Sequence, residues 1–431
     1  MRKKIEKIVL VIIIIGFCTV KGWTADNQLT PAEKKAGFVS VFNGRDLTGW
    51  DGDPRLWSVK DGVIQGQTTK ENPAHGNTFC IWRAGKLKNF ILKIKFRIQN
   101  GNSGIQYRSQ DLGKWRVSGY QAEVQNKQGK VGFLYHEGGR GWMVNVGDIM
   151  VVERDQKDKV QKNVVGKIAD VKELIKAGYY KDQGWNEYII TCRGNHIMHM
   201  LNGFQTIEMI DNDPKGRALE GILALQIHAG APMLVEFKDI RVKHLPDHFG
   251  MAKRLFNGLD LNNWTLSSEK LKDTWSVDDG LMINKGKPRG YIRTKADFTN
   301  YILRVQFRHQ GKGNGGVLLR MVGPDKVWPR SIEAQGQFGS AGDIWNIDKF
   351  PMKADSARTK GRHTVKLHET NEKPGQWNQY EITMDKDYLK LKVNELIQNT
   401  ATDCWETPGK ICLQSEGSPM EFRNLVLIPI H

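Results

Sequence analysis

The sequence predicts an all-β protein built from two consecutive jelly-roll β-sandwich domains. Three observations indicate this fold: one ordered pattern occurs twice, apolar and polar residues alternate in short runs, and Asn-Gly or Asp-Gly pairs separate those runs. The 431 residues are also too many for one ordinary hydrophobic core. The 45 glycines and 13 tryptophans fit a loop-rich and strand-rich chain rather than a coiled-coil or disordered one.

The internal repeat spans about 200 residues in each copy. FNGRDLTGW from Phe42 matches FNGLDLNNW from Phe256, and LQIHAG from Leu225 matches LQSEGS from Leu413. Further blocks match in the same order: WSVKDGVI with WSVDDGLM, NFILKIKFR with NYILRVQFR, GNSGIQYR with GNGGVLLR, YQAEVQ with IEAQGQ, and GWNEYII with QWNQYEI. We therefore expect a first domain over residues 37–245 and a second, divergent domain over residues 250–431.

Local patterns within each copy favour strands. FILKIKFRI, GILALQIHA and YLKLKVN alternate with period two, as half-buried strands do. The pairs Asn43-Gly44, Asp61-Gly62, Asn202-Gly203 and Asp279-Gly280 predict tight turns between strands. One helix is expected after Asp170, which is suited to the N-cap, and it should end at Gly178.

The first 22 residues have the pattern of a signal peptide. A basic start is followed by the apolar run Ile8–Phe17, which is short for a membrane span. Cys18 raises lipoprotein anchoring as the less favoured alternative, because Phe17 stands where a small residue is expected. No later stretch is apolar enough for a membrane span. The mature chain is expected to be exported, either periplasmic or secreted.

The formal net charge of +17 comes from scattered Lys and Arg residues, many of them next to acids. Nucleic-acid binding would require a concentrated basic patch in a recognisable module, and neither is visible. Four cysteines remain after export, and they are either disulfide-bonded or free: Cys80, Cys192, Cys404 and Cys412. No CxxC spacing indicates a zinc site.

The most informative stretch is Tyr120–Trp142, YQAEVQNKQGKVGFLYHEGGRGW. Alternation places Gln121, Glu123 and Gln125 on one strand face, while the residues between them form the core face. Gly138 and Gly139 then let the chain turn sharply. A row of amide and carboxylate groups suits a ligand rich in hydroxyl groups, and the loop adds Tyr135, Glu137, Arg140 and Trp142.

The second copy carries a similar pair in reversed order. Aligning the repeats places Glu333 opposite Gln121 and Gln335 opposite Glu123. Each copy thus has one carboxylate and one amide on the same strand face. The alternative interpretation is a plain polar outer face of a strand.

Three further residues complete the candidate site. In GNSGIQYR, alternation predicts that Gln106 and Arg108 share a face, and Arg320 repeats Arg108. His228 lies beside Gln226 in a late strand, and its counterpart is Glu416. Arg108 could bind an oxyanion or form a structural ion pair, and His228 could transfer protons or be structural. Trp142 and Trp345 could each stack on a sugar ring.

These ordered motifs together resemble the 3-keto-disaccharide hydrolase domain family, once in each copy and over nearly all of residues 37–431. The resemblance implies a concanavalin A-like jelly roll and action on glycosides whose sugar is oxidised at carbon 3. A ketone there acidifies the proton on carbon 2, so one base can start elimination of the group on carbon 1. We expect Glu123 to be the base, Arg108 to stabilise the enolate, and His228 to donate a proton.

The remaining candidates are expected to hold the sugar: Gln106, Gln121, Tyr135, Arg140 and Trp142 in the first copy, with Arg320, Glu333 and Gln335 in the second. A divalent metal on the enolate oxygens is compatible with this chemistry, although no ligand cluster requires one. Two other functions stay open. One is a conventional glycoside hydrolase that uses Glu123 and Glu137, and the other is a non-catalytic tandem lectin.

Overall fold

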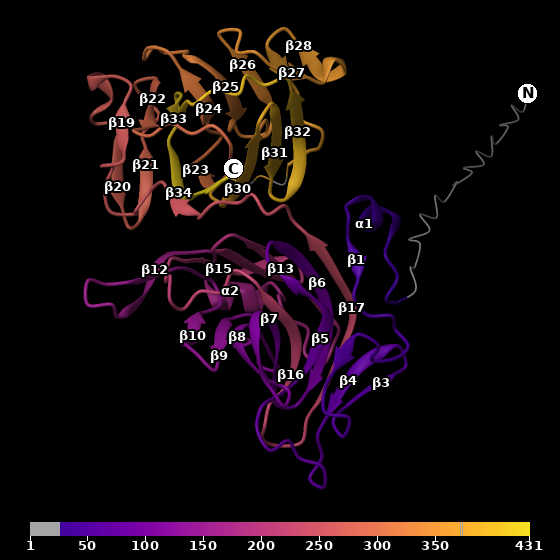
Figure 1. The fold of residues 1–431 in the computed structure, drawn as a ribbon. Coiled ribbons are helices and arrows are strands. Elements are labelled where there is room, and N and C mark those ends of the chain that lie inside the picture. The colour runs from indigo at the N-terminus through magenta and orange to yellow at the C-terminus, as the bar shows by residue number, and fades with distance from the viewer. Residues whose placement is uncertain (1–25, 371, 373) are drawn as a thin grey trace, which may run out of the picture.

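A computed structural model describes residues 26–431 apart from residues 371 and 373. The predicted signal peptide and Cys18 lie outside the described residues. The described chain forms two β-sandwich domains, one above the other in Figure 1, and each is built from a larger and a smaller sheet. The predicted all-β fold with two jelly-roll domains is thereby confirmed.

The larger sheet of the first domain has the order β12-β11-β15-β14-β13-β6-β17-β4-β3, with β1 paired to β17. Its strands are β1 (Val39–Ser40), β3 (Trp57–Lys60), β4 (Val63–Gln67), β6 (Phe90–Gln99), β11 (Asp148–Arg154), β12 (Val160–Lys167), β13 (Asn186–Arg193), β14 (His196–Leu201), β15 (Phe204–Asp211) and β17 (Leu234–His244). The smaller sheet has the order β10-β9-β8-β7-β16-β5-β2. Its strands are β2 (Trp50–Asp51), β5 (Thr78–Leu87), β7 (Asn102–Gly113), β8 (Arg116–Gln125), β9 (Leu134–Glu137), β10 (Gly141–Val144) and β16 (Gly221–Ile227).

The second domain repeats this plan. Its larger sheet has the order β20-β21-β34-β23-β30-β31-β32-β27, with β18 paired to β34. The strands are β18 (Lys253–Arg254), β20 (Trp275–Asp278), β21 (Leu281–Asn284), β23 (Tyr301–His309), β27 (Lys353–Ala354), β30 (Asn378–Asp385), β31 (Tyr388–Val393), β32 (Leu396–Thr402) and β34 (Met420–Pro429). The smaller sheet runs β19-β22-β33-β24-β25-β26-β29-β28. It contains β19 (Trp264–Leu266), β22 (Gly290–Thr294), β24 (Gly316–Val322), β25 (Arg330–Gln335), β26 (Ile344–Ile347), β28 (Thr359–Lys360), β29 (His363–Thr364) and β33 (Lys410–Ser415).

The local sequence signals explain these elements. Along β6 every second side chain is buried, because the apolar residues of FILKIKFRI face the other sheet and the charged ones do not. At Asp61-Gly62, Asn202-Gly203 and Asp279-Gly280 both residues have positive φ, as two-residue hairpin turns require. The expected helix is α2 (Val171–Lys176), where Asp170 accepts a hydrogen bond from the Lys172 amide. The other short helices are α1 (Pro31–Lys35), η1 (Glu269–Leu271) and η2 (Ser356–Arg358).

The two domains pack through the outer faces of their larger sheets. An apolar cluster joins Val151 and Ile210 of the first domain to Ile302 and Ile428 of the second. An ion pair links Arg193 to Glu381 at 3.2 Å. Figure 1 shows the larger sheets facing each other, with the smaller sheets on the far sides of the molecule. The outer faces of the two smaller sheets are therefore free to carry separate sites.

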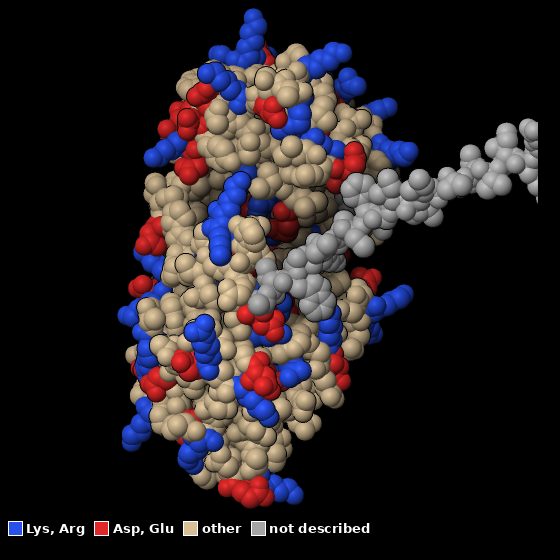
Figure 2. Space-filling view, turned by 90° about the vertical axis from the view of Figure 1, so that its right-hand side faces the viewer, with Lys and Arg blue, Asp and Glu red and all other residues tan. Residues whose placement is uncertain are grey.

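Other predictions concern charge, membranes and cysteines. Figure 2 shows Lys and Arg scattered among acidic residues over both domains, without one continuous basic patch on this face. Within residues 26–431, the structure contains no helix long and apolar enough to cross a membrane. Four thiols in the described chain are buried and free, which settles the choice between bridged and free cysteines for Cys80, Cys192, Cys404 and Cys412.

Candidate functional site

A cavity of about 280 Å³ opens on the outer face of the smaller sheet in the first domain. It lies where β7, β8, β9 and β10 meet the loop after β16. Five predicted site residues line it: Gln121, Glu123, Tyr135, Trp142 and His228. Asn77, Asn102, Phe133 and Glu137 complete the lining. The structure thus brings together side chains that are up to 151 residues apart in sequence, from Asn77 to His228 (228 − 77).

Glu123 lies at the base of this cavity and is only 2% exposed. Its two carboxylate oxygens accept hydrogen bonds from amides: Asn102 Nδ2 donates to Oε1 at 2.6 Å, and Gln121 Nε2 donates to Oε2 at 2.9 Å. Within the described residues, no Arg or Lys forms an ion pair with it. Burial, and to a smaller extent the charge of Glu137, raise the pKa of Glu123 to about 7. Such a carboxyl can both accept and release a proton near neutral pH.

A chain of hydrogen bonds fixes the orientation of the Gln121 amide. Gln106 Nε2 donates to Gln121 Oε1 at 2.6 Å, and Ser109 Oγ donates to Gln106 Oε1 at 2.8 Å. Because Gln121 Oε1 is already an acceptor, its Nε2 must face Glu123. Gly104 leaves the space for this arrangement, since a Cβ there would lie 2.2 Å from the Gln121 side chain. Gln106 is fully buried and lies outside the cavity lining, so it supports the site from below.

A second carboxylate stands across the cavity. Asn77 Nδ2 donates to Glu137 Oε1 at 2.9 Å, while Asn77 Oδ1 accepts from the Ala229 amide at 3.2 Å. This contact ties β9 to the loop that follows β16. His228 in that loop is exposed, and its Nδ1 is 2.6 Å from the Ala229 carbonyl oxygen. Since a carbonyl oxygen can only accept, Nδ1 carries a proton and Nε2 is left for a ligand.

Aromatic side chains form the remaining wall. The Trp142 ring stacks on Phe133 with centroids 3.8 Å apart and planes 12° apart. Trp142 is nevertheless 41% exposed, which leaves indole surface for a ligand. Tyr135 pairs directly with Gln121 across the β8–β9 ladder, so both side chains point to the same face. Exposed aromatic surface beside amides and carboxylates is typical of carbohydrate sites.

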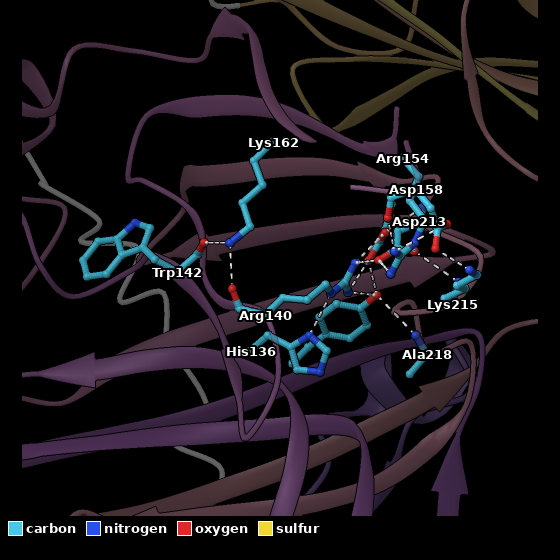
Figure 3. A network of polar contacts seen from close by, with 11 residues as sticks. His136, Arg140, Trp142, Arg154, Asp158, Lys162, Asp213, Lys215 and Ala218 are labelled. Atoms are coloured by element: carbon cyan, nitrogen blue, oxygen red, sulfur yellow. Dashed lines mark hydrogen bonds and ion pairs between the residues drawn. The ribbon is translucent and has the colours of Figure 1, made fainter. Parts of the chain in front are cut away.

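Arg140 does not line the cavity, contrary to its expected role in holding the sugar. Its Nη2 lies 2.6 Å from Asp211 Oδ2, its Nη1 lies 3.2 Å from Asp213 Oδ2, and its Nε donates to His136 Nδ1 at 3.0 Å. Figure 3 shows the Arg140 side chain directed into this network and the Trp142 ring on the opposite side. Burial, followed by the Arg140 charge, lowers the pKa of His136 to about 4, which keeps the imidazole neutral. Arg140 therefore anchors the β9–β10 hairpin that presents Tyr135, Glu137 and Trp142.

Arg108 is also absent from the cavity, so the expectation that it shares a face with Gln106 is wrong. The β7 ladder has an irregularity after Tyr107, and Arg108 has φ +47°, which breaks the alternation. The buried guanidinium donates to the carbonyl oxygens of Lys88 and Gly194, the latter at 2.7 Å. Arg320 repeats this geometry with φ +46° and contacts to Thr299, Asn300, Lys386 and Trp405. Both arginines bind backbone carbonyls of segments that connect strands, and neither is among the residues that line the two cavities.

The second domain has a corresponding cavity of about 200 Å³. It contains Glu333 and Gln335, the two predicted residues of β25, together with Trp345 and Glu416. Glu333 is 3% exposed, and burial, followed by the charge of Glu416, raises its pKa to about 8. The lining is completed by Asn314, Trp328, Gln337, Ile347 and Arg362. The ladder pairs Glu333 with Trp345 as it pairs Gln121 with Tyr135, so the two cavities have matching positions.

Several residues that line the two cavities were not predicted from the sequence. Asn77 lies in a loop before β5, and nothing in its local pattern indicates a contact with Glu137. Arg362 and Trp328 come from loops of the second copy that lie outside the matched blocks. Asn102, by contrast, could be found because it is the second residue of the GNSGIQYR block, and the structure pairs it with Gln125 on β8. In the part of the chain that the structure describes, no group of three metal-ligating His, Cys, Asp or Glu side chains is present.

A family model for the 3-keto-alpha-glucoside-1,2-lyase-like domain matches residues 37–243 and again residues 251–428. The chain belongs to this family. The match confirms the resemblance drawn from the sequence motifs, and it covers each of the two domains separately. No match is found among curated proteins.

Among solved structures, this chain is similar to a putative glycosyl hydrolase from Parabacteroides distasonis, with 22% identity over 52% of this chain and 100% of that one, and a TM-score of 0.35. It is similar to the carbohydrate binding module CBM66 from Bacillus subtilis, with 13% identity over 38% and 95% of the chains and a TM-score of 0.30. A third structure is a Bacillus licheniformis beta-glucanase, with 11% identity over 43% and 100% of the chains and a TM-score of 0.32.

Proposed function

We propose that this protein is exported, that it cleaves glycosides oxidised at carbon 3, and that the first domain carries out the reaction. The observation that supports this most is Glu123, a buried carboxyl held by two amides in a cavity that also contains Glu137 and His228. A base of this kind suits removal of a proton already acidified by a neighbouring ketone. The family match to a lyase-like domain points to the same chemistry.

The reaction begins when Glu123 takes the proton from carbon 2. The electron pair of that C–H bond moves toward the carbon-3 ketone and forms an enolate. Arg108, first expected to stabilise this charge, lies elsewhere. The Tyr135 hydroxyl, on the same face as Gln121, is the remaining neutral donor of the lining suited to the enolate oxygen.

The enolate then collapses. The ketone re-forms, a double bond forms between carbons 1 and 2, and the bond from carbon 1 to the glycosidic oxygen breaks with its electron pair. His228, in its imidazolium form, gives the Nε2 proton to the leaving oxygen, since its Nδ1 proton is engaged with Ala229. Addition of water across carbons 1 and 2 would yield the hydrolysis product.

The test compares the wild-type protein, Glu123→Gln and the matched surface variant Glu173→Gln on a 3-keto-glucoside. Released sugar is measured with and without EDTA, which also tests the divalent-metal alternative. We expect turnover by wild type and Glu173→Gln and a loss of about 100-fold or more in Glu123→Gln. Full turnover by Glu123→Gln would overturn the assignment of the base.

A conventional glycoside hydrolase is the second candidate function. One observation favours it: Glu123 and Glu137 line one cavity, and conventional glycosidases also place two carboxylates in one site. The same assay separates the two functions. Cleavage of an unoxidised disaccharide would favour the two-carboxylate enzyme. Binding without release of sugar would favour the lectin.

For the second domain we propose sugar binding rather than elimination. Glu416 replaces His228, Ile347 stands at the position of Glu137, and Gln335 stands at that of Glu123. Two tryptophans and Arg362 remain available for a sugar. If Glu333→Gln and Trp345→Ala abolish turnover in the full chain as completely as Glu123→Gln does, the second domain is catalytic and this assignment is wrong.

A further inference from the structure

The cleft of the first domain continues beyond the cavity that contains Glu123. A second cavity of about 510 Å³ adjoins it, and the two share Asn102 and His228 as walls. The second cavity is bounded by Gln125, Asn126 and Lys127 at the end of β8 and by Ala229–Ala231 in the loop after β16. One ligand can therefore extend from Glu123 past His228 into this second lobe.

The position of His228 gives the two lobes different roles. In the proposed reaction Glu123 acts on the oxidised sugar, and His228 protonates the leaving oxygen. The oxidised sugar must then lie on the Glu123 side, and the atoms beyond the broken bond must lie on the other side of His228. We infer that the second lobe binds the leaving group, and that it selects leaving groups rich in hydroxyl groups over aromatic ones. This inference rests on the proposed function.

The lining chemistry supports this selectivity. Gln125 and Asn126 offer amide donors and acceptors, and Lys127 offers an ammonium group. The rest of the lining includes Ala229–Ala231 and the apolar side chain of Met233. No Phe, Tyr or Trp is among the described residues that line this lobe, whereas the first lobe has Phe133, Tyr135 and Trp142. Aryl groups gain most from stacking on aromatic rings, while hydroxyl groups need hydrogen-bond partners.

The second domain has different residues at the corresponding place. Phe338 stands there at the position of Asn126, and its ring packs edge-on against His309 with centroids 6.0 Å apart. The loop after the last strand of the smaller sheet is also one residue shorter, with EGSP at Glu416 in place of HAGAP at His228. The two domains thus differ in the residues that border this lobe.

The experiment uses the full chain and three substrates with the same 3-keto-glucosyl group and different leaving groups: methyl, p-nitrophenyl and glucosyl. Ala231→Trp and Asn126→Phe fill the second lobe from opposite sides, and the exposed Ala357→Trp in the second domain is the matched control. We expect each lobe variant to lose about tenfold in kcat/KM for the glucosyl substrate while turnover of the methyl substrate stays within about twofold. The control should match wild type.

The outcomes separate the two proposals. Equal losses on the methyl and glucosyl substrates, or no loss in either lobe variant, would overturn the inference and leave the proposed function in place. A wild-type preference for the p-nitrophenyl substrate, after correction for its intrinsic reactivity, would overturn the selectivity. No turnover of any of the three substrates by wild type would overturn the proposed function together with the inference.

Discussion

Glu137 and Glu123 face the same cavity, and the negative charge of Glu137 adds to burial in raising the pKa of Glu123 to about 7. A base must be deprotonated, so kcat/KM should rise with pH as Glu123 ionises, and the midpoint of this rising limb should lie near pH 7. Glu137→Gln removes the negative charge that disfavours ionisation of Glu123, and this rising limb should move to lower pH. A pH profile of kcat/KM for both proteins measures the shift. A limb that stays in place would show that the two carboxyls are not coupled.

The hydrogen bonds from Gln106 to Gln121 and from Gln121 to Glu123 give a second prediction. In Gln106→Leu, Gln121 Oε1 loses its donor and the Gln121 amide is free to turn away from Glu123. Since hydrogen bonds from amides favour the charged carboxylate, the rising limb should move to higher pH, and kcat should fall by about tenfold. The exposed Gln67→Leu serves as the control. A Gln106→Leu protein with lower stability but an unchanged pH profile would limit Gln106 to a structural role.

Arg140, which anchors the β9–β10 hairpin, gives a third prediction. Arg140→Met leaves Asp211 buried without its cation, while Asp213 keeps Arg154, so the free energy of unfolding should fall by roughly 3–5 kcal/mol. Below the new melting temperature, KM should rise more than kcat falls, because the hairpin positions Tyr135 and Trp142 but not Glu123. In Arg140→Lys, KM should lie between the values of Arg140→Met and wild type.

Arg154→Met is the matched control, because Arg154 pairs with Asp213 from the rim and does not contact the hairpin. Its effect on KM should be small. If Arg140→Met has the KM of wild type, Arg140 has only a structural role and does not position the hairpin for the substrate. Denaturant unfolding and steady-state kinetics together separate these cases.

The sequence predicted the fold and the core of the site because both depend on short-range patterns. Alternation along β8 was enough to place Gln121 and Glu123 on one face, and the repeat was enough to find Glu333 and Gln335. Tyr135 reached the same face because β9 pairs with β8 after a short loop. The predicted helix also depended only on local capping residues.

The two arginine roles could not be predicted in this way. Alternation assigns Arg108 to the Gln106 face, but the ladder irregularity and positive φ direct it to backbone carbonyls of Lys88 and Gly194. Arg140 is bound by Asp211 and Asp213, which are over 70 residues later in the chain. No local pattern shows that such partners exist, so the sequence alone leaves both arginines available for a ligand.

Glu333 gives the last prediction, which concerns stability rather than turnover. Its pKa is raised to about 8 in the folded protein, so between the ordinary carboxyl pKa and pH 8 the folded state keeps a proton that the unfolded chain releases. Stability should therefore decline as pH rises through this range. Glu333→Gln removes this contribution, and because each pKa unit corresponds to about 1.4 kcal/mol, the variant should be more stable than wild type at pH 9 by a few kcal/mol. At pH 5 the two proteins should differ little, and the exposed Glu269→Gln should follow wild type at both pH values. Urea unfolding at pH 5, 7 and 9 measures the difference. Equal curves for wild type and Glu333→Gln at pH 9 would show that ionisation of Glu333 does not lower the free energy of unfolding.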